Sequence, residues 1–209
     1  MFAPAPFLLK DTSVSQVMTQ VCIALVPGIA AYAWLVGPAI LVQLVIATLA
    51  ALLAETAMLR VQNKPLSLFL SDGSAIVTAW LIALTFPPLA PWWLVVIGTV
   101  FAIVVAKHLY GGLGQNPFNP AMVAFAVCIV AFPALMSQWP PAGQLSFDTQ
   151  LSLILGGPRD IDGITGATAL DALRTGLRSG VQTVDKVLEG SAFGALGGRG
   201  WEWVSIGYV

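Results

Sequence analysis

Long runs of apolar residues, separated by short turns, dominate the first two thirds of the chain. A helix that crosses a bilayer needs about 20 mainly apolar residues, and five windows approach that length. They predict membrane-spanning helices over residues 14–36, 38–58, 72–86, 91–106 and 119–136.

The third window is shorter than the others. A polar stretch from Ser71 through Asp72 and Gly73 precedes it, and Pro87 and Pro88 follow it. This pattern predicts a tilted or re-entrant helix whose irregular ends are buried among its neighbours. Asp72 is then most simply read as the residue that caps the start of this helix.

Basic residues lie in the N-terminal arm and in every second turn between the predicted helices, and this pattern predicts the orientation of the helices. Lys10, then Arg60 with Lys64, then Lys107 fall in the N-terminal arm, the second turn and the fourth turn. The first and third turns carry no charge. Lys and Arg near the ends of spans stay on the cytoplasmic side, so we expect a cytoplasmic N-terminus and an external segment after the fifth helix.

Composition supports a protein that lies in lipid. Of the 209 residues, 57% are hydrophobic and only 9% are charged, whereas a typical soluble chain has about 25% charged residues. A net charge of −1 offers no basic surface for nucleic acid. Cys22 and Cys128 lie inside apolar runs and predict neither a disulfide framework nor a metal site. The N-terminal residues predict no cleaved signal peptide.

Composition changes after residue 136, where most of the 20 glycines lie. We therefore expect a transmembrane domain over residues 1–136 and an extracytoplasmic segment over 137–200. Residues 201–209 are apolar enough to begin a sixth span. Within the external segment, Leu170 and Leu173 mark one face of a short amphipathic helix.

The local sequence at Thr168 predicts the start of that helix. Thr168 is followed three residues later by Asp171, a capping pair. A phosphate esterified to the threonine hydroxyl would meet unpaired backbone N–H groups and the positive end of the helix dipole. A plain helix cap after a glycine turn explains these residues equally well.

Residues 107–121 contain three glycines and two prolines between two predicted spans. Such a run cannot continue a helix, and Asn116 or Asn119 can cap the next one. It is either a tight turn that packs on a neighbour or a segment that contacts a ligand. Together with the turn over residues 84–93 and the stretch over residues 52–55, the run resembles the D subunit of the Rnf electron-transport complex, also called Rsx. The B subunit of the sodium-pumping NADH:quinone reductase carries a related run.

The resemblance has implications for the cofactor. In that family the last threonine of an Asp-Gly-x-(Ser/Thr)-x-Ala-Thr motif is esterified to FMN by a dedicated flavin transferase. Carried over, the acceptor is Thr168, and the matching motif residues are Asp162, Gly163, Thr165 and Ala167. The family also implies two inverted halves with ten spans in total, of which this chain resembles the first half plus the external loop. Riboflavin, in a site that includes later helices, is a further implication.

Glu55 is the acidic residue that lies well inside a predicted span. A charge near the centre of a bilayer costs about 2.5 to 3.5 kcal/mol on insertion scales, so it should be compensated. It is either part of an ion or proton path, or a carboxylate that reaches the interface near Arg60. His108 is expected to be an interfacial or packing residue, because metal sites need several converging ligands. We assign no metal and no catalytic residue.

These observations favour an all-α, multi-pass subunit of an ion-translocating oxidoreductase in the bacterial inner membrane. The resemblance implies partner subunits, electron transfer of the ferredoxin and NAD type, and a flavin on the periplasmic face. The alternative is a secondary transporter or channel with a broken third helix and a site near the centre of the membrane. Thr168 distinguishes the two, because a transporter gives no reason for the motif.

Overall fold

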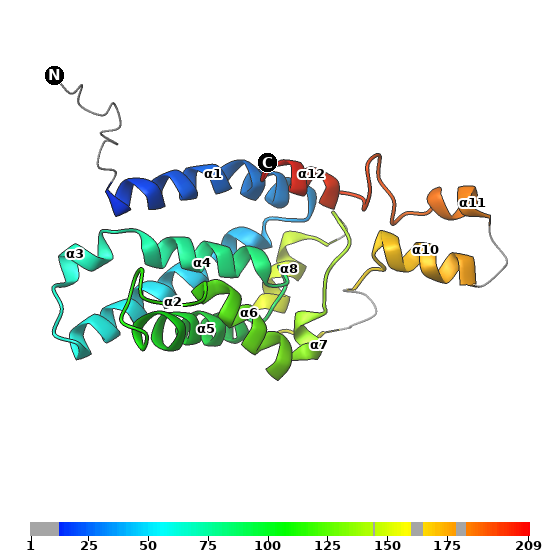
Figure 1. Ribbon diagram of the computed structural model, residues 1–209. Helices are drawn as coiled ribbons and strands as arrows, with labels where there is room; N and C mark the ends of the chain where they lie inside the picture. Colours follow the sequence, from blue (N-terminus) through cyan, green and yellow to red (C-terminus); the bar gives the residue numbers. More distant parts are fainter. Residues whose placement is uncertain (1–12, 144, 160–164, 179–182) are drawn as a thin grey trace, which may run out of the picture.

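The computed structural model describes residues 13–143, 145–159, 165–178 and 183–209 (Figure 1). Over these residues the chain is built from helices, and an isolated bridge joins Phe193 to Gly198. Asp162, Gly163 and Lys10, which the sequence singles out, lie outside the described residues.

Five apolar segments form a bundle, as the hydrophobic pattern predicts. Two helices are long and apolar enough to cross a membrane, and the three others are shorter. The segments are α1 (Val14–Leu35), α2 (Ala39–Val61), α4 (Ser74–Thr85), α5 (Trp92–Phe101), which continues as the π-helix η1 (Ala102–His108), and α6 (Pro120–Ala131).

The helix ends follow local chemistry. Ser13 starts α1 with a capping box, in which its hydroxyl accepts from the Gln16 N–H and the Gln16 side chain accepts from the Ser13 N–H. Asn119 caps α6 by accepting from the Ala121 N–H at 2.9 Å, which confirms one of the two predicted caps. Asn116 instead donates to the Phe118 carbonyl.

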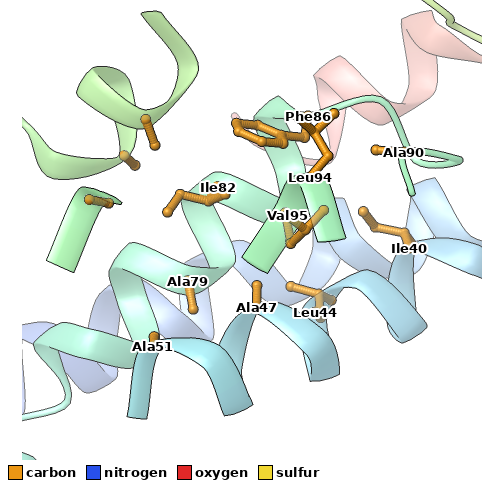
Figure 2. Close-up of a cluster of buried hydrophobic side chains, with 14 of the residues drawn as sticks. Ile40, Leu44, Ala47, Ala51, Ala79, Ile82, Phe86, Ala90, Leu94 and Val95 are labelled. Atoms are coloured by element: carbon orange, nitrogen blue, oxygen red, sulfur yellow. The ribbon is translucent and has the colours of Figure 1, made fainter. Parts of the chain in front are cut away.

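The core of the bundle lies between α2, α4 and α5. Ile40, Leu44, Ala47 and Ala51 of α2 face Ala79 and Ile82 of α4 and Val95 of α5, as Figure 2 shows. Small side chains at these contacts let the helix backbones approach closely, which is how helices associate in lipid.

The outer face of α2 is apolar and exposed. Val45, Leu49 and Leu53 are 57%, 57% and 72% exposed. A continuous exposed apolar surface of this kind is suited to lipid rather than to water.

Consecutive helices of the bundle run in opposite directions, so the molecule has two distinct ends. The short helix α3 (Leu66–Leu70) lies at one end, whereas α7 (Pro133–Met136), α8 (Phe147–Ile154), α10 (Ala169–Arg178) and α11 (Val184–Leu188) lie toward the other (Figure 1). The segment after residue 136 therefore gathers at the end of the bundle remote from α3.

Two elements attach this segment to the bundle. The Gln150 side chain of α8 accepts from the Ala39 N–H at the start of α2, at 3.1 Å. The last helix, α12 (Trp201–Ile206), lies along α1 (Figure 1). Gly28 of α1 permits this close approach, because a Cβ there would collide with the Tyr208 ring.

Candidate functional site

Thr168 stands at the N-terminus of α10, as its local sequence predicts. Its hydroxyl oxygen accepts from the Asp171 N–H at 3.2 Å, and its carbonyl accepts from the Ala172 N–H at 2.9 Å. The residue is exposed. An exposed hydroxyl beside the unpaired N–H groups of a ten-residue helix is well placed to carry a phosphate.

The motif residues before Thr168 pack against the turn that follows α7. The Gly166 N–H donates to the Trp139 carbonyl, and a Cβ at Gly166 would press on the Pro141 ring. Ala167 lies beside Thr168 in the cavity described next, whereas Thr165 is half-buried. The glycine therefore brings the threonine close to the turn that carries Trp139.

A groove of about 730 Å³ opens beside Thr168. Ligand pockets for molecules of cofactor size typically measure about 300–1,000 Å³ and are mainly apolar. Most of the lining residues are apolar or small, and they come from α10, the turn after α7 and the segment before α12. They are Trp139, Pro141, Ala142, Gly143, Ala167, Thr168, Ala169, Leu170, Ser191, Ala192, Gly198, Arg199 and Trp201. The groove therefore has the volume and the lining typical of a site for a ligand of cofactor size.

Two of these residues, Trp139 and Trp201, are stacked edge to face with ring centroids 5.6 Å apart. Tyr32 of α1 packs on Trp201 in the same manner, at 5.3 Å. The contact between Trp139 and Trp201 could not be inferred from the sequence, because the two residues are far apart in the chain.

Arg159 holds the groove-bearing segment against the bundle. Its guanidinium donates to the carbonyls of Leu89 and Leu153, both at 2.7 Å, and to the Gln138 side chain at 3.0 Å. Burial lowers the pKa of Arg159 from its ordinary value. This role could not be predicted from the sequence, because the partners of Arg159 come from three separate segments.

A second polar cluster lies near the opposite end of the bundle. Lys107 Nζ is 2.8 Å from Glu55 Oε1 and 2.8 Å from Ser74 Oγ, and the Lys107 and Glu55 side chains are 3% and 2% exposed. His108 Nε2 is 3.1 Å from Glu55 Oε2, a close contact without hydrogen-bond alignment. Glu55 is therefore compensated within the protein and does not reach the interface beside Arg60.

Lys107 and His108 occupy the last turn of η1. His108, which was expected either at the interface or in packing, is buried and takes the packing alternative. Lys107, which the sequence offers only as a marker of orientation, is buried against Glu55. A π-helix widens the turn, and such segments are frequent at functional sites. A cavity of about 300 Å³ adjoins Glu55, Lys107 and His108, and another of about 240 Å³ adjoins Lys107 and Asn119.

Asp72 was expected to cap the start of α4, but it lies one residue before the N-cap. Its carboxylate accepts from the N–H and the hydroxyl of Ser74, at 2.7 and 2.6 Å, while Gly73 is the N-cap, with a φ of 77°. The break between α3 and α4 thus lies at the end of the bundle and its carboxylate is occupied. This arrangement gives no support to a broken-helix site at the centre of the membrane.

Cys128 is buried, as expected of a small apolar residue, and Cys22 is half-buried. Across the described ranges, the His, Cys, Asp and Glu side chains form no group of three that could bind a metal ion.

Comparisons of the sequence with known proteins identify its family. A profile described as the NQR2, RnfD, RnfE family matches residues 1–209. The D subunit of an ion-translocating oxidoreductase complex from Escherichia fergusonii is 41% identical over 224 residues. Proteins of the same name from Yersinia pseudotuberculosis and Aeromonas salmonicida are 42% and 43% identical. In each case 99% of this chain is covered, and the chain spans 63% of the relative's length.

Proposed function

The chain belongs to the NQR2, RnfD, RnfE family of membrane proteins, and from this premise we propose that it carries a covalent FMN in an ion-translocating oxidoreductase complex. The observation that carries the proposal is the exposed Thr168 hydroxyl, which caps α10 at the edge of an apolar groove. A helix N-terminus favours a phosphate, and the groove has the volume for an aromatic ring system.

Attachment requires one bond exchange at Thr168. The hydroxyl oxygen forms a phosphoester with the phosphorus of FMN and loses its proton, while a flavin dinucleotide donor releases a nucleoside monophosphate. We assign this step to a separate flavin transferase, which recognises Asp162, Gly163, Thr165 and Ala167. The bound flavin would supply electron transfer, and the protein supplies position and electrostatics.

The membrane arrangement is a further part of the proposal. The five apolar segments form one half of an inverted-repeat architecture in the bacterial inner membrane. The transmembrane domain covers residues 1–136, the extracytoplasmic segment covers 137–200, and residues 201–209 begin a sixth span. Arg60 and Lys64 lie beside α3, at the end of the bundle opposite Thr168 (Figure 1), which supports a cytoplasmic N-terminus and a periplasmic flavin. Lipid and the other subunits of the complex cover the apolar faces.

We assign Glu55 to the path of the translocated ion or proton. Its contacts with Lys107 and His108 make a buried cluster of three titratable groups beside a cavity, and ionisable groups inside membranes commonly mark such paths. In the complex that still assembles, with uptake normalised to its flavin content, Glu55→Gln should lower ion uptake driven by electron transfer. Uptake at the wild-type rate would leave Glu55 with a structural role only.

The test of the proposed function compares Thr168→Ala with the matched variant Thr165→Ser in the assembled complex. Thr168→Ala should lose in-gel flavin fluorescence and electron transfer, because the attachment atom is gone, yet still assemble, because a lost cap costs only about 0.5–2 kcal/mol. Thr165→Ser should keep both. Flavin released on denaturation reports noncovalent riboflavin separately. Covalent fluorescence that persists in Thr168→Ala contradicts the proposal.

A further inference from the structure

The groove beside Thr168 has an aromatic wall built from two segments that are distant in sequence. Trp139 follows α7, and Trp201 is the first residue of α12. Their ring planes meet at 73°, and Tyr32 also contacts Trp201 edge to face, with ring planes at 76°. Through these two ring contacts the groove is connected to α1.

We propose that Trp139 and Trp201 form the wall on which the isoalloxazine ring of the flavin packs. In the same proposal, Arg199 is the cation that faces the negative charge that the ring gains on reduction. This rests on the proposed function, because it takes Thr168 as the point of attachment. The inference adds which residues of the chain position the ring and adjust its reduction potential.

The tryptophans are held in place before any ligand arrives. The Trp139 indole N–H donates to the Met136 carbonyl at 3.2 Å. Because this donor is already engaged within the protein, Trp139 can contact a ligand through its aromatic surface. Trp201 is held by edge-to-face contacts with both Trp139 and Tyr32. A rigid aromatic surface loses little conformational entropy on binding, and offset or edge-to-face contacts between rings are favourable.

The attachment atom and the wall belong to the same cavity. Thr168, Ala169 and Leu170 line it from the start of α10, and the two tryptophans line it from the other segments. A ring tethered at Thr168 therefore reaches the wall without leaving the groove.

Arg199 alone is charged among the described residues that line the groove. The loop that carries it is ordered by Glu202, whose carboxylate accepts from the N–H groups of Ala195 and Leu196 at 3.2 and 2.7 Å. The Arg199 N–H also donates to the Ala192 carbonyl. Reduction adds negative charge to a flavin, and a nearby guanidinium stabilises that charge and raises the reduction potential.

The test uses the full-length subunit within the purified complex. Trp139→Leu and Trp201→Leu are compared with Trp203→Leu, a matched control on α12 whose side chain is 50% exposed and lies outside the groove lining. Fluorescence of the denatured protein gives the flavin content, and native emission per flavin gives ring packing, because a stacked indole quenches flavin emission by electron transfer. We expect native emission to rise severalfold and its anisotropy to fall in the first two variants only.

Phenylalanine variants keep the test decisive where a leucine variant does not assemble. Trp139→Phe and Trp201→Phe retain an aromatic wall but lack the indole that quenches flavin emission by electron transfer. The native flavin emission should therefore rise while its anisotropy stays high. Equal native emission in all variants, with full flavin content on denaturation, would overturn the inference and leave the proposed function intact. Wild-type protein without covalent flavin would instead contradict the proposed function.

Arg199→Gln gives an independent readout. The flavin midpoint potential should fall relative to wild type, because the charge that stabilises the reduced form is removed. Arg178→Gln, an exposed arginine of α10 outside the groove lining, is the matched control and should leave the potential unchanged. Equal potentials in Arg199→Gln and wild type contradict the role of Arg199.

Discussion

Removing either partner of the Lys107–Glu55 pair should destabilise the bundle strongly. The two charged atoms are 2.8 Å apart and both side chains are almost fully buried, so each single substitution leaves a buried charge without its opposite charge at 2.8 Å. Breaking a buried pair in this way costs about 3–5 kcal/mol. Glu55→Gln and Lys107→Met should each approach that cost.

The double variant should recover most of the loss, because it removes both charges together. Replacing a buried pair by neutral side chains of similar volume is often close to neutral, so the coupling energy in a double-mutant cycle should exceed about 2 kcal/mol, well above the roughly 0.5 kcal/mol within which independent sites add. Unfolding free energy measured by denaturing-detergent titration of the purified subunit in micelles gives all four corners of the cycle.

Arg60→Met is the control for loss of a charge on α2. Arg60 is exposed, and surface substitutions of this kind usually change stability by no more than about 0.5 kcal/mol. A structural role for the buried pair is refuted if Glu55→Gln and Lys107→Met cost no more than Arg60→Met, or if their costs simply add in the double variant.

Three further predictions concern the attachment of the external segment and its orientation. Arg159→Lys should lower the unfolding free energy by about 1–3 kcal/mol, because a lysine ammonium cannot reproduce the planar arrangement of N–H donors with which the guanidinium binds two carbonyls. An unfolding midpoint in the detergent titration equal to that of wild type contradicts this. Gly28→Leu should displace the Tyr208 ring and cost about 1–3 kcal/mol through overpacking, and an unfolding free energy equal to that of wild type argues against the α1–α12 contact. In a background without the two native cysteines, Asn63→Cys should react with an impermeant thiol reagent only from the cytoplasm and Leu196→Cys only from outside; the reverse pattern overturns the orientation.

The sequence predicts what depends on neighbouring residues. The Thr168 cap follows from Asp171 three positions later, and the Asn119 cap follows from the proline after it. The five apolar segments are likewise apparent from local hydropathy. Each of these features is decided within a few residues, so one chain is enough to find it.

Contacts between distant segments could not be predicted in the same way. Glu55 and Lys107 are 52 positions apart. The hydropathy pattern ends the fourth helix at residue 106, inside the π-helix and just before its buried last residues, Lys107 and His108. Trp139 and Trp201 meet only because α12 returns along α1. Bundle packing, rather than local preference, determines all of these pairs.

The measurement that tests the central claim most directly is tandem mass spectrometry of the tryptic peptide spanning residues 160–174 from wild-type protein purified from membranes. This peptide contains both Thr165 and Thr168, so its fragments distinguish the two hydroxyls. We predict an FMN phosphoester on Thr168. An unmodified peptide, or FMN found on Thr165, would contradict the claim.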